Sequence, residues 1–287
     1  MEGWAATLSR PEQIRPAPPL APVRAALRLY AHLLRATLRA QRQYPVDFAL
    51  GLGVGVLLTA AEAVSIVVIL WRFHTIGGWG PADIAVLYGV ATASYALHRL
   101  GAGDLHGLSE YVRTGTFDAL LLRPCAPLFT LLARSGRVNQ LASLLVPVAA
   151  LVGGCVNLSR AGHLPAWALA CLAGVLLCAV ALQFAIGIAT NAAAFWIVRA
   201  DELSVLTVNA PNTAAAYPLA VYPGWLRGYL TAVVPVGLVT YAPVRFLVGR
   251  GGSVGALFVA PAAAAAALGV ALWVWRRGQA RYAGTGT

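Results

Sequence analysis

The chain has 287 residues, of which 59% are hydrophobic and 11% are charged, whereas soluble globular domains carry about 25% charged residues. The mean hydropathy of +0.72 excludes an ordinary water-soluble domain and indicates a protein that is solvated mainly by lipid. All 21 basic residues are arginines, against 10 acidic residues, and they cluster beside apolar segments, which is typical of a membrane protein rather than a nucleic-acid-binding protein.

The first 47 residues precede the apolar segments. Residues 1–22 are rich in proline and predict a disordered cytoplasmic tail. Residues 23–47 predict an amphipathic helix, because at about 100° per residue its basic side chains share one face and leucines fill the other. The arginines of this face are Arg24, Arg28, Arg35, Arg39 and Arg42. We expect the helix to lie in the membrane interface and bind anionic lipids, although a basic helix that packs on a partner protein would show the same pattern.

Six apolar segments follow, and about 20 helical residues cross an apolar core of about 30 Å. The predicted spans are 48–71, 82–100, 138–158, 165–198, 203–222 and 254–275. Five prolines interrupt residues 203–248, so we expect one kinked span there, followed by a re-entrant segment over 223–250 that is surrounded by protein or water. The expected fold is an all-α polytopic membrane protein with six transmembrane helices, an N-terminal amphipathic interfacial helix and a re-entrant helical hairpin before the last span.

The arginines also predict the orientation. Sixteen lie in the N-terminal segment, at Arg99 and in the loop 101–137 that follows it, at Arg199 and in the C-terminal segment, and five lie in the alternate connections. Because cytoplasmic loops carry the excess of arginine, both termini are expected in the cytoplasm.

Polar residues inside the predicted spans are few. Glu62 is the only acidic residue deep within a span, and Asn191, Asn209 and Asn212 are amides in similar positions. Each is a candidate for lining a translocation path, and Glu62 could also accept protons. For Glu62, a carboxyl group that holds two helices together accounts equally well for the position, and for the three asparagines interhelical hydrogen bonding is the favoured interpretation.

The sequence gives little support for an enzymatic function of this chain. Residues 101–104 match the Gly-x-Gly-Asp pattern of intramembrane aspartyl proteases, but such chemistry needs a second aspartate at comparable depth, and no other predicted span contains an aspartate. The histidines are scattered and the cysteines form no Cys-x-x-Cys pair, so no metal site is expected. A Walker A motif needs a lysine, and the chain has none.

The loop 101–137 is the most informative segment. Between residues 104 and 123 its leucines and Phe117 have spacings that suit a short amphipathic helix, although an ordinary interfacial loop has similar periodicity. Residues 113–124 read Arg-Thr-Gly-Thr-Phe-Asp-Ala-Leu-Leu-Leu-Arg-Pro. This sequence resembles the cytoplasmic signature of a bacterial subfamily of type-2 ABC exporter permeases, and the resemblance extends to the Pro-rich region after the fifth span.

The resemblance implies that residues 48–287 form a permease domain in the bacterial plasma (inner) membrane. It implies a second permease, identical or related, and two copies of a separate ATPase that binds ATP and Mg²⁺, with no cofactor on this chain. The loop would dock on the ATPase. Its contact candidates are Arg113, Phe117, Asp118, Leu121 and Arg123.

Two other classes of function stay open. The chain could be a non-transporting membrane scaffold or a lipid-modifying membrane protein whose basic helix gathers anionic lipids. A secondary transporter fits less well, because Glu62 is the only acidic residue deep within a span and no inverted repeat is evident. The few amides and one carboxyl would suit lipids, peptides or hydrophobic drugs alike, so the sequence leaves the substrate open.

Overall fold

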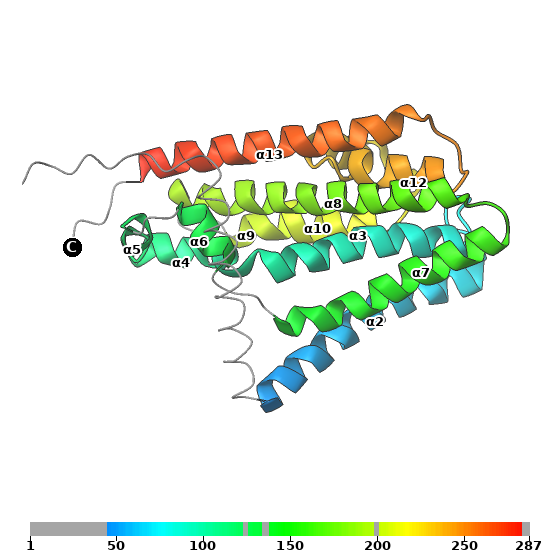
Figure 1. Ribbon diagram of the computed structural model, residues 1–287, viewed down its shortest axis with the longest axis horizontal. Coiled ribbons are helices and arrows are strands. Elements are labelled where there is room, and N and C mark those ends of the chain that lie inside the picture. The colour runs from blue at the N-terminus through cyan, green and yellow to red at the C-terminus, as the bar shows by residue number, and fades with distance from the viewer. Residues whose placement is uncertain (1–44, 123–125, 134–137, 198–200, 283–287) are drawn as a thin grey trace, which may run out of the picture.

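The computed structural model describes residues 45–122, 126–133, 138–197 and 201–282. The predicted N-terminal tail and residues 23–44 of the predicted basic helix lie outside these residues, as does Arg123. The described residues are helical and contain no β-strand. The helices run roughly side by side in one elongated bundle (Figure 1).

Four helices in the described part of the chain are long and apolar enough to cross a membrane, and they coincide with the first, third, fourth and sixth predicted spans. They are α2 (Pro45–Phe73), α7 (Leu145–Arg160), α8 (Ala166–Ala192) and α13 (Gly255–Arg281). The third span begins as a 3₁₀ helix, η2 (Val138–Leu144), before α7. This is the expected consequence of Pro147, which has no N–H to donate to the carbonyl group of Ser143.

The second predicted span forms α3 (Pro81–Gly101), but α3 is not among the four strongly apolar helices. It packs against α7, α8 and α10 (Figure 1). Most of its residues are buried. Thr92, Ser94 and His98 are polar residues in this buried set. A helix enclosed by other helices can carry such groups at lower cost than a helix that faces lipid, which accounts for its weaker hydropathy.

The close packing of α3 on α7 depends on two glycines. A Cβ atom on Gly89 would lie 2.6 Å from the Cβ atom of Leu151, and one on Gly154 would lie 2.8 Å from the carbonyl oxygen of Ala82. Small residues at these positions let the two backbones approach each other.

Replacing Gly154 with alanine is therefore expected to destabilise the protein by about 1–3 kcal/mol, because the added methyl group forces the two helices apart. Gly153 is the matched control, since a Cβ atom there has nothing within 4 Å. The measurement is thermal unfolding of the Gly154→Ala and Gly153→Ala variants in detergent. Equal unfolding temperatures for the two variants would contradict the packing account.

The chain between α8 and α13 is a series of short helical pieces. The first run comprises α9 (Asp201–Ser204), the π-helical turn η4 (Val205–Asn209), α10 (Ala210–Ala215) and the 3₁₀ turn η5 (Leu219–Val221). The second comprises α11 (Gly224–Gly228), the π turns η6 (Tyr229–Val233) and η7 (Gly237–Tyr241), and α12 (Ala242–Leu247). Two short helical segments, Gly224–Val233 and Gly237–Leu247, thus occur where predicted and are bent by 86°. We call them the bent pair.

Prolines explain the π turns in this region. η4, η6 and η7 each end two residues before a proline, namely Pro211, Pro235 and Pro243. A proline cannot donate to the carbonyl group four residues earlier, and a π turn is a local adjustment that accommodates the broken ladder. The helix that begins at Asp201 ends at Ala215, which makes it shorter than the predicted fifth span.

The two ends of the bundle differ (Figure 1). One end, which we call the turn end, carries the α2–α3, α7–α8 and α12–α13 connections. The opposite end, which we call the loop end, carries the end of α13 and four short helices from the segment between α3 and η2. These are η1 (Gly103–Gly107), α4 (Leu108–Arg113), α5 (Asp118–Leu121) and α6 (Pro127–Ala133).

At the turn end the bent pair is fastened to the start of α3. The buried Asp83 carboxylate accepts hydrogen bonds from the Gly80 N–H at 2.9 Å and from Nε of Arg250 at 2.8 Å. Trp79 also stacks on Tyr241, with the ring centroids 5.4 Å apart. Charge-assisted bonds to a buried carboxylate are stronger than neutral ones, so α12 and the residues after it are held in place.

Candidate functional site

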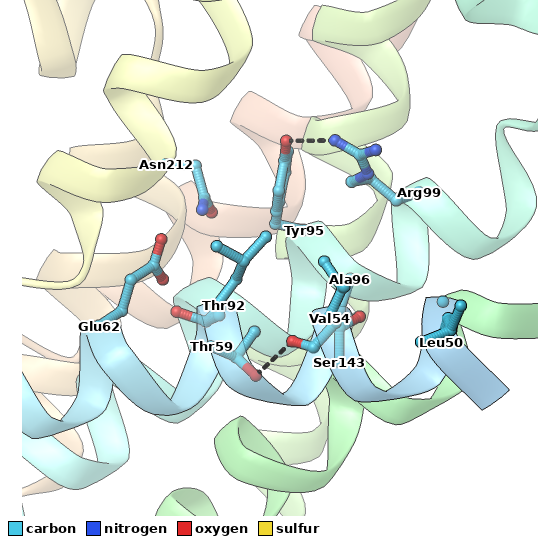
Figure 2. Close-up of a pocket in the computed structure, with 13 residues that line it drawn as sticks. Leu50, Val54, Thr59, Glu62, Thr92, Tyr95, Ala96, Arg99, Ser143 and Asn212 are labelled. Atoms are coloured by element: carbon cyan, nitrogen blue, oxygen red, sulfur yellow. Dashed lines mark hydrogen bonds between the residues drawn. The ribbon is translucent and has the colours of Figure 1, made fainter.

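A polar cavity of about 570 Å³ lies between α2, α3, η2 and α10. It adjoins a second cavity of about 220 Å³ that shares Glu62, Thr92 and Asn212 with it. Figure 2 shows side chains from α2 and α3 projecting into the space between them. The cavity combines hydroxyl, amide, carboxyl and guanidinium groups with aliphatic side chains, so it can receive an amphipathic molecule.

Helix α3 supplies a polar stripe to this region. Tyr88, Thr92, Tyr95 and Arg99 follow one another at spacings of three or four residues, which places them on one face of a helix. Nη1 of Arg99 donates to the Tyr95 hydroxyl at 3.1 Å, and that hydroxyl donates to Oδ1 of Asn209 at 2.8 Å. The Arg99 charge is therefore connected to η4 through a neutral side chain.

Glu62 enters the cavity from α2. Its carboxylate points toward Asn212 and Thr92 (Figure 2). Within the single chain Glu62 is exposed, as are most residues of α2. An acidic side chain near the centre of a span costs roughly 3 kcal/mol when it faces lipid, so a position beside a polar cavity lowers that cost.

Three of the four predicted path residues come together here. Glu62 and Asn212 line both cavities, and Asn209 is bonded to the lining residue Tyr95. Asn191 lies elsewhere: it is buried in α8, and its Nδ2 donates to the Gly187 carbonyl oxygen of the same helix at 2.7 Å. The structure adds the α3 stripe to the predicted residues, and the three- and four-residue spacing of that stripe was a signal available in the sequence.

The loop end carries a second feature, formed by α4, α5 and the turn between them. Residues 104–122, the described part of this segment, do not form the single amphipathic helix that the periodicity suggested, because Gly115 adopts a φ of 72° and reverses the chain. The N–H of Phe117 then donates to the Tyr111 carbonyl oxygen at 3.0 Å, which closes the turn.

Phe117 fastens this turn to the membrane helices. Its ring is fully buried and makes edge-to-face contacts with Phe195, at 5.3 Å between centroids, and with Tyr282, at 5.1 Å. Phe195 in turn contacts Trp275 of α13 at 5.4 Å. The aromatic cluster, which we define as Phe117, Phe195, Trp275 and Tyr282, therefore joins the loop to the ends of α8 and α13.

Asp118 lies near Tyr282 at the same junction. Burial raises the pKa of the Tyr282 phenol, and the nearby Asp118 carboxylate raises it further. The phenol therefore stays neutral at physiological pH. Leu120, on the same short helix, is buried with Phe117.

The opposite side of the loop faces outward. The Leu122 side chain is 88% exposed and Leu121 is 47% exposed. Arg113 forms an exposed ion pair with Glu110 at 2.6 Å. Of the described contact candidates, Phe117 thus faces the interior of the protein, whereas Arg113 and Leu121 lie on a surface that a partner can reach.

The helices and the polar cavity define a multi-pass helical membrane protein. The model of the family described as ABC-2 family transporter protein matches residues 56–286. The chain therefore belongs to the ABC-2 transporter family and is a membrane permease of an ABC transporter. No curated protein and no solved structure matches it.

Proposed function

We propose that this chain is the permease subunit of an ATP-driven exporter and is moved by a separate ATPase that docks on α4 and α5. The observation that carries the proposal is the two-sided loop end. The aromatic cluster attaches the loop to α8 and α13, while Leu121, Leu122 and Arg113 remain accessible. A packed element of this kind moves as a unit, so force applied to its outer side reaches both membrane helices.

The substrate route in this proposal is the cavity between α2, α3 and α10. Closure of the ATPases on ATP would switch the cavity between inward and outward access, since the ligand biases one of two states. Glu62, Asn209, Asn212 and the α3 stripe are the path residues. Asn191 acts as a helix-packing residue, in keeping with its bond inside α8.

A second permease, identical or related, would cover α2. The described part of α2 exposes many large apolar side chains together with Glu62. Lipid can cover the apolar side chains, but an ionisable group in a span normally faces protein or a water-filled cavity. A second subunit beside α2 would enclose Glu62 and complete the cavity wall.

The membrane arrangement of the proposal has six spans in the bacterial inner membrane. α3 is the second span and residues 201–222 contribute the fifth. The bent pair is re-entrant from the turn end, which faces outward, and both termini are cytoplasmic. The pair's attachment to α3 through Asp83 and Arg250 supports this placement. ATP and Mg²⁺ bind the partner, because a chain without lysine supplies no ordinary Walker A site.

Leu122→Asp tests the docking surface. We expect the variant to fold normally, because the residue is exposed, and to retain about tenfold less of the ATPase encoded beside its gene during co-purification, since a charge in an apolar contact costs at least about 1.4 kcal/mol. Ala161→Asp, at an exposed position in the α7–α8 turn, is the control. Retention of the ATPase at the normal ratio in Leu122→Asp would remove α5 from the docking surface.

A further inference from the structure

An apolar groove runs along α13, and none of its lining residues lines the polar cavity. It has a volume of about 500 Å³ and lies between α8, α13, η4 and the bent pair. Alanines line much of it, and its hydroxyl groups are those of Thr190, Thr207 and Thr231. Thr190 and Thr207 bond to each other at 2.7 Å, which leaves a predominantly apolar surface.

A separate basic and aromatic hollow lies further along α13, toward the loop end. The hollow has a volume of about 390 Å³ and is lined by Trp196, Trp273, Arg277 and Arg281, among others. The Arg277 guanidinium lies over the Trp273 ring, 5.1 Å from its centroid. Tryptophan beside arginine is typical of the interface between the apolar core and the headgroups of a bilayer.

The groove and the hollow share one face of α13. At about 100° per residue, six lining residues fall within an arc of about 80°. They are Ala263, Ala266, Val270, Trp273, Arg277 and Arg281. The side chains that α13 buries, including Ala264, Ala271 and Trp275, lie on a different face. The stripe is therefore one continuous surface that changes from apolar to cationic.

The length of the stripe matches one leaflet of a bilayer. From Ala263 to Trp273 a helix rises about 15 Å, at about 1.5 Å per residue. Half of an apolar core of about 30 Å is also about 15 Å. The two arginines follow within the next three turns, at the depth of the lipid headgroups, and long side chains can extend further toward them.

We propose that this surface binds one anionic diacyl phospholipid from the leaflet at the loop end. An acyl chain lies in the alanine-lined groove between α13 and the bent pair, and the phosphate group pairs with Arg277 and Arg281. Basic pockets between membrane helices bind anionic headgroups in this way, and two guanidinium groups select a net negative charge over a zwitterion. The site is separate from the substrate cavity and does not depend on the proposed transport function.

The test uses neighbouring residues of α13 as matched pairs. Phosphatidylglycerol and phosphatidylcholine with identical acyl chains are titrated into detergent-solubilised protein, and binding is followed by native mass spectrometry. Arg277→Gln combined with Arg281→Gln should weaken phosphatidylglycerol binding by about 30-fold, which corresponds to about 1 kcal/mol for each arginine near an anionic headgroup. Arg276→Gln, whose residue is on the same helix but does not line the hollow, should leave binding unchanged.

A second pair tests the groove itself. Ala266→Phe should weaken the binding of both lipids because the ring fills the acyl-chain space, whereas Ala265→Phe should not, since Ala265 is exposed on another face. Glycerol 3-phosphate, which has the charge without the chains, should not compete. Equal binding of the two lipids by the unmodified protein, equal effects within either matched pair, or displacement by glycerol 3-phosphate would overturn the proposal. Circular dichroism establishes that each variant is folded.

Discussion

Replacing Phe117 with alanine is expected to lower the free energy of unfolding by about 3–5 kcal/mol, the usual cost of truncating a fully buried aromatic residue. The variant removes the edge-to-face contacts with Phe195 and Tyr282 and leaves a cavity between the loop and the membrane helices. The effect should be large for a residue outside the apolar spans, because it disconnects α5 from two membrane helices at once.

Thermal or denaturant unfolding of the purified protein in detergent measures this effect. Leu122→Ala is the control, because a side chain that is 88% exposed contributes little to the folded state. A Phe117→Ala protein as stable as Leu122→Ala would show that the aromatic cluster does not hold the loop, and the proposed transmission of force would lose its basis.

In the assembled transporter the same two variants should separate two roles. Phe117→Ala is expected to keep the exposed docking residues and bind the ATPase, while ATP hydrolysis no longer drives movement of α8 and α13. Leu122→Ala is expected to weaken ATPase binding while the loop stays attached to the membrane helices.

Much of the fold follows from local sequence. α2, α8 and α13 are apolar over spanning length, and their positions agree with the predicted spans. The prolines after residue 203 correctly indicated short, broken helices. They did not predict π turns, because a π turn is one of several ways to accommodate a missing N–H, and packing selects among them.

Contacts between residues that are far apart in the chain could not be predicted from the sequence. The ion pair of Asp83 with Arg250 and the contact of Phe117 with Tyr282 each join residues more than 150 positions apart. The periodicity of the loop indicated amphipathic helical structure but could not show that Phe117 faces inward. Its burial depends on Phe195 and Tyr282, which come from other parts of the chain.

The candidate site was predictable in part. Glu62, Asn209 and Asn212 stood out because polar groups are rare in apolar spans, and the structure brings them to one region. Asn191 is also a polar residue in an apolar span, but it does not line the cavity and instead bonds to the backbone of its own helix, α8. Composition alone does not say which face of a helix a residue occupies. Tyr95 and Arg99 could have been found from the spacing of the polar residues on α3.

In the proposed transporter a separate ATPase opens and closes the cavity beside α2, and cysteine labelling tests this without knowledge of the substrate. Leu58 lines the cavity and is 63% exposed, whereas its neighbour Leu57 is 68% exposed but is not among the lining residues. Each is replaced by cysteine after the four native cysteines are changed to alanine. The proteins are then reconstituted into vesicles with the partner ATPase and labelled with a charged thiol reagent.

ATP and Mg²⁺ are expected to change the labelling rate of Leu58→Cys by about tenfold when the ATPase is present, equivalent to a shift of about 1.4 kcal/mol between open and closed states. Leu57→Cys should label at one rate throughout, and omission of the ATPase should abolish the response of Leu58→Cys. A nucleotide response of Leu58→Cys without the ATPase, or none in the complete assembly, would contradict the claim.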